Sequence, residues 1–303
     1  MELCRTGRIY EVERWIVQGK PLQVAHLPKI TPRSSRTPLE ITIDTGQQDL
    51  ALLLLSNGYQ PQLEPEFSIN RGLRKKRWGI VRLLIQWGVD PRQVDPRTVL
   101  DSYDRDMFEL FWEAGVDYTQ DGLLATYLAF TGSNRPLYGW VRRHRDEPRI
   151  ASAMIQALLK AFLEDHDRAA CMLLWAGADP HRLCAPEDFG LDEEDENEPR
   201  TALEQAVCYG KGKYLKKIMH LDPTRDDLER ISRFVCDGEA VDALVEHWSS
   251  KDYSQAIVGN IRRMSYGLSQ WESQSEKCLK RIAFHGGRLN RLGMPPITRH
   301  SKC

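Results

Sequence analysis

Three triplets in the chain match motifs of protein kinases. His144 to Asp146 reads HRD, Ala185 to Glu187 reads APE, and Asp188 to Gly190 reads DFG. A kinase needs them in the order HRD, DFG, APE, with a glycine-rich loop over the phosphates and an asparagine shortly after the HRD aspartate. Here APE precedes DFG, Ile150 occupies the asparagine position, and the sequence has no glycine-rich loop. The triplets therefore indicate chance matches in loops rather than phosphoryl transfer.

His181 and Cys184 have the side chains and the spacing of two metal ligands. A structural zinc site takes four ligands, and no second cluster in the sequence supplies the other two. His166 and Cys171 lie nearby, but helical spacing turns Cys171 away from a loop site. We interpret the first pair as a loop histidine and a half-buried cysteine. Since no GxSxG, HExxH, Walker or GxGxxG motif occurs, we expect no enzymatic activity, no metal and no cofactor.

Eight carboxylates and no basic residue lie between Glu187 and Glu198. Crowded on one polar loop, they are expected to be solvated and mutually repulsive rather than tuned for acid–base catalysis. We treat 185–199 as an inserted loop, because loops that exceed the usual length are often functional or disordered. We expect this loop either to contact a basic protein surface or to be a solubilising insert, and we narrowly favour the insert. Its candidate partner-binding residues are Asp192, Glu193, Glu194, Asp195 and Glu196.

The other candidate partner-binding residues are basic side chains and two tryptophans. A solvated helix face or turn is the simpler interpretation of each basic group. Exposed tryptophan is enriched at the centres of binding surfaces, but filling of gaps between neighbouring units is the interpretation we favour for both rings. Trp15 and Trp112, by contrast, are predicted to lie in the core. The candidate residues are Lys29, Arg33, Arg36, Trp87, Arg92, Arg142, Arg143, Arg145, Trp175 and His181.

One phrase recurs along the chain: an apolar triplet, two freer residues, a glycine, and a turn that often contains Asp-Pro. It predicts the end of a helix, because glycine adopts the left-handed C-cap conformation and proline prevents the helix from continuing. Successive glycines are 30 residues apart from Gly58 to Gly88, 27 from Gly88 to Gly115, and 62 from Gly115 to Gly177. The copies are Arg14 to Pro21, Leu53 to Pro61, Leu83 to Pro91, Leu110 to Asp117, Met172 to Pro180 and Ile282 to Gly287.

A second phrase marks helix starts at Thr37 to Gly46 and Thr201 to Gly210. Thr37 is the predicted N-cap and Pro38 the first helical residue. Together the two phrases resemble the ankyrin-repeat family, with Glu40 where the family has histidine. The resemblance implies an all-α solenoid of roughly eight or nine helix-turn-helix units, several of them degenerate, that binds a partner on a concave face of loops and inner helices.

The expected organisation follows from where the phrases are clear. We predict an ankyrin-repeat solenoid over 1–222, clearest at 36–91 and 150–222, with the acidic inserted loop at 185–199. Residues 223–290 are expected to be degenerate C-terminal helical repeats or a cap, a separate small helical domain being the rival interpretation. Residues 291–303 are expected to form a flexible tail.

Composition limits the classes of partner. The formal net charge is -1, from 42 basic and 43 acidic side chains, so no whole-molecule field draws in nucleic acid or anionic lipid. The longest apolar run, Leu50 to Leu55, is too short to span a bilayer, and the start does not read as a secretory signal. Seven cysteines without a CxxC motif suit a reducing compartment.

We therefore expect a cytoplasmic protein-interaction scaffold that is a monomer or part of a hetero-complex. It would be an adaptor, an inhibitor or an immunity or defence-associated protein, and by family resemblance a bacterial one. The alternative is a regulatory scaffold subunit that contacts nucleic acid or a nucleoprotein complex through its basic loops.

Overall fold

The computed structural model describes residues 2–22, 36–61, 68–184, 200–221, 223–235 and 237–248. The described part is helical apart from one pair of two-residue strands, as the all-α prediction requires. No described helix is both long and apolar enough to cross a membrane. The predicted helices from 257 to 289 and the tail at 291–303 lie outside the described residues. The chain divides into two compact units, Met1–Leu123 with Asn134–Trp140, and Leu124–Ser133 with Val141–Cys303.

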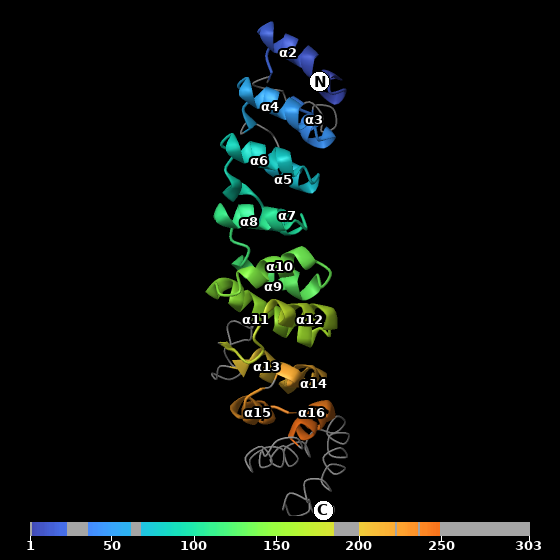
Figure 1. The fold of residues 1–303 in the computed structure, drawn as a ribbon, viewed down its shortest axis with the longest axis vertical. Coiled ribbons are helices and arrows are strands. Elements are labelled where there is room, and N and C mark those ends of the chain that lie inside the picture. The colour runs from blue at the N-terminus through green and yellow to red at the C-terminus, as the bar shows by residue number, and fades with distance from the viewer. Residues whose placement is uncertain are drawn as a thin grey trace, which may run out of the picture. The chain divides into compact units, whose positions relative to one another are not determined.

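The first unit is built from helix pairs (Figure 1). Within it, α1 packs on α2, α3 on α4, α5 on α6 and α7 on α8. The first helices of successive pairs also contact one another, from α1 through α3 and α5 to α7, while α4 joins α2 to α6. The helices are α1 (Glu2–Arg5), α2 (Ile9–Val17), α3 (Pro38–Thr45), α4 (Gln48–Ser56), α5 (Ser68–Arg74), α6 (Trp78–Gln86), α7 (Pro96–Leu100), α8 (Arg105–Glu113) and most of α10 (Arg135–Arg143), with 3-10 turns at Pro91–Gln93 and Gln120–Gly122.

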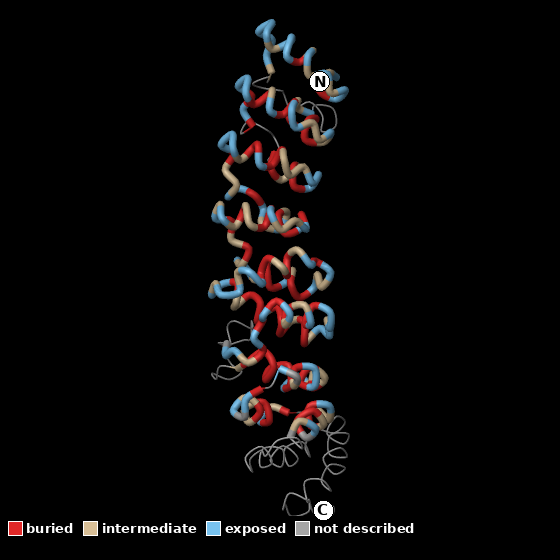
Figure 2. The backbone as a smooth tube through the Cα atoms, in the orientation of Figure 1, coloured by how far each residue is buried: buried red, intermediate tan, exposed pale blue. Residues whose placement is uncertain are grey.

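The second unit repeats this contact pattern. α11 packs on α12, α13 on α14, and α11, α13 and α15 contact in succession, as do α14 and α16. Its elements are α9 (Leu123–Phe130), the end of α10, α11 (Pro148–Leu163), α12 (Asp167–Ala176), β1 (Leu183–Cys184), β2 (Arg200–Thr201), α13 (Ala202–Cys208), α14 (Lys213–Ile218), a 3-10 turn (Met219–Leu221), α15 (Arg225–Ser232) and α16 (Gly238–Trp248). In both units the buried residues concentrate where helices face one another and the exposed ones at turns (Figure 2).

The predicted glycine helix ends are confirmed at every copy within the described residues. In all five, the N–H of the residue after the glycine donates to the carbonyl five positions back, as Val89 does to Leu84 at 3.1 Å. In every copy except that of Gly19, this residue is itself buried, which anchors the departing chain. The glycines and their φ values are Gly19 at 67°, Gly58 at 84°, Gly88 at 85°, Gly115 at 91° and Gly177 at 99°.

The turns inside the pairs share a second feature. Each contains one residue in the left-handed region, where side chains other than glycine are strained. The predicted turn glycine Gly46 has a φ of 76°, and three pairs place a non-glycine residue there. These left-handed turn residues are Gly7, Gly46, Lys76, Tyr103, Asp165 and Gly210. The pairs therefore resemble one another in their turns as well as in their ends.

The predicted helix starts form full capping boxes. Thr37 precedes α3, and its hydroxyl accepts from the Glu40 N–H at 3.1 Å while the Glu40 carboxylate accepts from the Thr37 N–H at 2.9 Å. Thr201 and Glu204 repeat this at α13, with distances of 3.0 and 2.8 Å. At each helix start, two backbone N–H groups that have no acceptor within the helix are thereby hydrogen-bonded.

The strand pair lies at the borders of the acidic segment. Leu183 pairs with Thr201 and Cys184 with Arg200 in antiparallel register. The residues on either side of 185–199 are thus hydrogen-bonded to each other, and Thr201 goes directly on to cap α13. The acidic segment itself lies outside the described residues.

An aromatic cluster forms the core at one end of the first unit. Trp140 and Tyr118 are fully buried, and their ring centroids lie 5.5 Å apart in an edge-to-face arrangement. Trp112, a predicted core residue, is half-buried and lies 5.8 Å from Tyr118 and 5.5 Å from Trp140. The core prediction is wrong for Trp15, which is 41% exposed. α2 is amphipathic and buries Val12. Nζ of Lys20 lies 4.5 Å from the centroid of the exposed Trp15 ring.

Candidate binding surface around Arg142 and Trp175

The candidate site lies in the second unit, where two helices end. α10 ends with the basic pair Arg142 and Arg143, and a turn over 144–147 leads to α11. α12 ends at Ala176, followed by Gly177 in the left-handed conformation. Leu173 and Ala176 face the core in the last turn of α12. Trp175, which lies between them in sequence, is directed to the other side of the helix.

Arg142 and Trp175 are in direct contact. The guanidinium carbon of Arg142 lies 4.5 Å from the centroid of the Trp175 ring, within cation–π distance. Trp175 is nevertheless 51% exposed, and Arg142 is exposed as well. Our preferred sequence interpretation, that Trp175 fills a gap between units, is therefore wrong. The ring stands on the surface because the buried side of its helix turn is already occupied.

A second guanidinium lies beside this pair. A methyl group at Gly177 would lie 3.1 Å from Cδ of Arg145, so the Arg145 side chain crosses the end of α12 two residues from Trp175. The nearest carboxylate is that of Asp146, 3.8 Å from Arg145 Nε and 93% exposed. In the same turn, His144 Nδ1 lies 2.6 Å from a carboxylate oxygen of Glu147. Arg143 is exposed on the adjoining end of α10.

The structure thus joins four of the predicted binding residues, Arg142, Arg143, Arg145 and Trp175. We call them the Arg–Trp surface. It also places the HRD triplet in an exposed turn, where His144 is engaged by Glu147. That contact orients the turn.

The other predicted residues have different roles or lie elsewhere. Trp87 and Arg92 belong to the first unit, where Trp87 is 41% exposed, against the gap-filling interpretation, and Arg92 pairs with Asp90 at 3.0 Å. That contact lowers the pKa of the Asp90 carboxyl, mainly through the side-chain hydrogen bond. His181 Nδ1 lies 3.8 Å from Asp227. Outside the described residues lie Lys29, Arg33, Asp192, Glu193, Glu194, Asp195 and Glu196.

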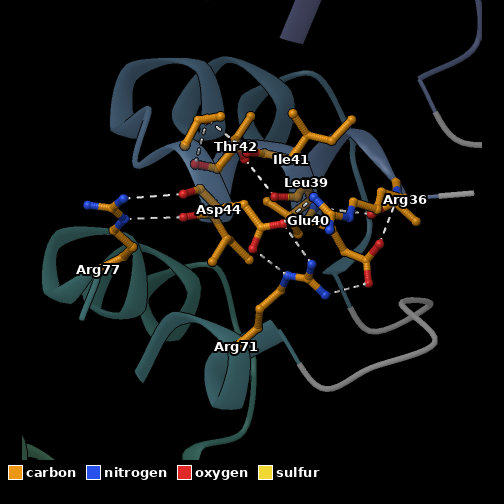
Figure 3. A network of polar contacts seen from close by, with 11 residues as sticks. Arg36, Leu39, Glu40, Ile41, Thr42, Asp44, Arg71 and Arg77 are labelled. Atoms are coloured by element: carbon orange, nitrogen blue, oxygen red, sulfur yellow. Dashed lines mark hydrogen bonds and ion pairs between the residues drawn. The ribbon is translucent and has the colours of Figure 1, made fainter. Parts of the chain in front are cut away.

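Arg36 belongs to a polar network that holds α3 to α5 (Figure 3). Arg71 donates to both carboxylate oxygens of Asp44, at 3.0 and 2.7 Å, and to Glu40 at 3.1 Å. Arg36 adds a contact to Asp44 at 3.2 Å. The hydrogen bonds from Arg71, with the nearby positive charges, lower the pKa of Asp44.

Arg77 completes this network by covering Gly46. Its guanidinium donates to the backbone oxygens of Ile43 and Asp44 at 3.4 and 3.2 Å, which satisfies the last carbonyls of α3. A methyl group on Gly46 would lie 2.8 Å from Cζ of Arg77. Arg71 and Arg77, which lie at the two ends of a run rich in basic residues, therefore both have a structural role.

A further charged cluster joins α12 to α14. Lys217 contacts Asp167 at 2.6 Å, Lys213 contacts Asp165 at 2.8 Å, and the Tyr214 hydroxyl donates to Asp167 at 2.9 Å. The hydrogen bonds from Lys217 and Tyr214 lower the pKa of Asp167 to about 2. Burial and the Asp167 carboxylate raise the pKa of Tyr214. Both lysines and the tyrosine contact an aspartate, so the cluster is suited to holding the helices together.

Within the described residues, no group of three or more His, Cys, Asp or Glu side chains is arranged to hold a metal ion. No model of a protein family matches the chain, and no curated protein is detectably similar to it in sequence.

Proposed function

We propose that the chain is a non-enzymatic scaffold of ankyrin-like repeats that binds a protein partner, as an adaptor, inhibitor or defence-associated protein does. The recurring helix pairs support the repeat architecture. They share a left-handed turn residue inside the pair and, in five cases, a left-handed glycine after the second helix. Two of them begin with the same capping box. Stacked helix pairs of this kind build extended surfaces on which loops and helix ends are available to a partner.

The observation that carries the proposal is the Arg–Trp surface. Tryptophan and arginine are the residues most enriched at the energetic centres of protein interfaces. Here they contact one another at 4.5 Å while both are exposed. The location differs from the one that the family resemblance implies, because Trp175 belongs to the end of the second helix of its pair. Two described cysteines, Cys4 and Cys171, are free thiols, which supports a cytoplasmic setting.

The test is co-purification of a partner with the tagged full-length chain from its native cells, followed by the same experiment with the double variant Arg142→Gln, Trp175→Ala. The matched control is Arg92→Gln, Trp87→Ala, which removes an exposed tryptophan and an exposed arginine from the first unit. We expect one protein to be retained by the wild type and the control and lost by the double variant. Absence of any stoichiometric protein partner would refute the proposal.

The alternative, a scaffold that contacts nucleic acid, uses the same observation, since single-stranded sites also combine aromatic rings with arginine. It predicts that nuclease treatment removes the retained material. It further predicts that log affinity falls steeply and linearly with log salt concentration. A shallow salt dependence together with nuclease resistance favours the protein partner.

A further inference from the structure

We infer that the Arg–Trp surface recognises an acidic peptide segment, in which a carboxylate side chain lies next to an aromatic or branched aliphatic side chain. This inference rests on the proposed function, because it specifies the chemistry of the proposed protein partner. It concerns the end of α10, the turn after it and the end of α12, all within the second unit.

The charge of the Arg–Trp surface favours an acidic partner. Three arginines lie within four positions, and all three are exposed. In the part of the chain that the structure describes, the one carboxylate in ion-pair distance of them is that of Asp146, at 3.8 Å from Arg145. An exposed pair of that length contributes little. Arg142 and Arg143 thus carry positive charge that the described neighbours do not neutralise, and a carboxylate from a partner complements it.

The hydrogen-bond donors of Arg142 remain available to a carboxylate. A cation–π contact uses the charge of the guanidinium and not its N–H donors. Arg142 therefore retains its five donors for an anion while Trp175 limits where its side chain goes. A guanidinium held in this way loses less side-chain entropy when it forms a bidentate contact with a carboxylate. The exposed part of the Trp175 ring then offers apolar area to the residue next to that carboxylate.

The composition of the Arg–Trp surface favours a peptide over a nucleic acid. Sequence-independent sites for single strands have a continuous basic groove and several aromatic rings in succession. The Arg–Trp surface has one exposed ring, and its turn contains the exposed carboxylate of Asp146 and the half-buried one of Glu147. A closely spaced row of phosphates is repelled by these carboxylates, whereas a peptide with one or two acidic side chains avoids them. The formal net charge of -1 adds no long-range attraction for a polyanion.

The test begins with unbiased selection of peptides displayed on phage against the immobilised full-length chain. Parallel selection is made against the double variant Arg142→Gln, Trp175→Ala. We expect the wild-type chain to enrich peptides in which Asp or Glu adjoins Tyr, Phe, Leu or Ile, and the double variant not to enrich them. Enrichment of basic or purely apolar peptides, the same peptides from both proteins, or no enrichment from the wild type overturns the inference.

The best peptide, labelled with fluorescein, is then measured by anisotropy against single variants. We expect Trp175→Ala and Arg142→Gln each to weaken binding by about tenfold or more, as removal of a central anchor does. Arg142→Lys retains the positive charge but lacks the planar guanidinium, so its affinity for the peptide is expected to lie between those of the wild type and Arg142→Gln. The control Arg92→Gln, Trp87→Ala is expected to bind as the wild type does. Equal binding by all variants overturns the inference.

A labelled oligothymidylate of the same length is the phosphate probe. If this probe binds more tightly than the acidic peptide, and the double variant loses that binding, the surface belongs to nucleic acid and the inference is overturned. Circular dichroism and the thermal midpoint of each variant verify that it is folded. The proposed function fails separately, if no protein co-purifies. A co-purified protein that the double variant still retains leaves the proposed function standing and rejects this surface as the site.

Discussion

The guanidinium of Arg71 contacts the carboxylate of Glu40 at 3.1 Å, and that same carboxylate caps the start of α3. The second unit contains the equivalent contact. Arg230 in α15 lies 2.9 Å from Glu204, the capping-box residue of α13. In each case a carboxylate that completes one helix start is held by an arginine from the first helix of the next pair. The cap and the packing of consecutive pairs are thus coupled through one side chain.

Replacement of Arg71 is therefore expected to be costly. Arg71→Met leaves two carboxylates, Glu40 and Asp44, close together and largely buried without their shared cation. Breaking a buried pair in this way costs about 3 kcal/mol. The measurement is the midpoint of urea denaturation. Arg82→Met is the control, because its pair with Asp106 is exposed and 3.5 Å long, and we expect a change within about 0.5 kcal/mol there. Equal losses for the two variants would show that the network contributes nothing specific.

The turn between α5 and α6 offers a stabilising change. Lys76 has a φ of 55°, a conformation that costs a residue with a Cβ about 1 kcal/mol or more. Lys76→Gly removes that cost and is expected to raise the thermal midpoint, partly offset by the larger entropy that glycine loses on folding. Lys75→Gly is the matched control, since Lys75 is exposed in the same turn without a positive φ. It is expected to lower the midpoint. A fall for both variants would contradict the prediction.

Local signals in the sequence were sufficient for the helix ends and starts. A glycine after an apolar triplet, or a threonine three residues before a glutamate, specifies a backbone conformation through its nearest neighbours alone. Gly88 and Thr201 therefore have the roles predicted for them. The class of fold follows from the same local rules, because helices that end at regular intervals must pack in pairs to bury their apolar sides.

Contacts between residues far apart in the sequence could not be predicted from such local signals. Arg71 lies 31 residues from Glu40, and Arg230 lies 26 residues from Glu204. The one signal available in the sequence is that an arginine follows each of these two glutamates after a similar number of residues, 31 and 26. The prediction failed for Trp15 because the apolar triplet was expected to be buried throughout, although a helix turn buries only one side. The contact between Arg142 and Trp175 joins two different helices that no spacing in the sequence connects.

Acid is expected to weaken the cluster between α12 and α14. The pKa of Asp167 in the folded protein is about 2, below its ordinary 3.8, mainly because Lys217 and Tyr214 donate to its carboxylate. A lowered pKa stabilises the folded protein fully above the ordinary value, and the contribution is lost as the pH falls towards the folded one. Asp167→Asn is therefore expected to be less stable than the wild type at pH 7. The difference in urea midpoint is expected to narrow between about pH 4 and pH 3.

Salt provides the control for that experiment. The Asp167 side chain is about half exposed, 52%, so its ion pairs are screened, and 0.5 M sodium chloride is expected to reduce the difference at pH 7. If the difference in urea midpoint between the wild type and Asp167→Asn does not change with pH or salt, the asparagine acts through packing and not through the lost charge.

Gly177 links the stability of α12 to the Arg–Trp surface. Its φ of 99° strains any other residue, and a methyl group there also meets the Arg145 side chain at 3.1 Å. Gly88 has a similar φ of 85° but nothing within 4 Å of the same position. Both Gly177→Ala and Gly88→Ala are expected to lose about 1–2 kcal/mol from the left-handed strain alone. The two stability losses, measured by urea denaturation, should therefore be comparable.

The two variants differ in what else they disturb. Gly177→Ala moves Arg145 and is expected to weaken binding of the selected acidic peptide severalfold, since Arg145 supplies part of the positive charge beside Trp175. Gly88→Ala leaves that surface untouched and is expected to bind as the wild type does. Measurement below the unfolding transition of both variants separates the two effects. Loss of binding in both would mean that strain at any helix end impairs the molecule, and unchanged binding in both would mean that Arg145 lies outside the contact.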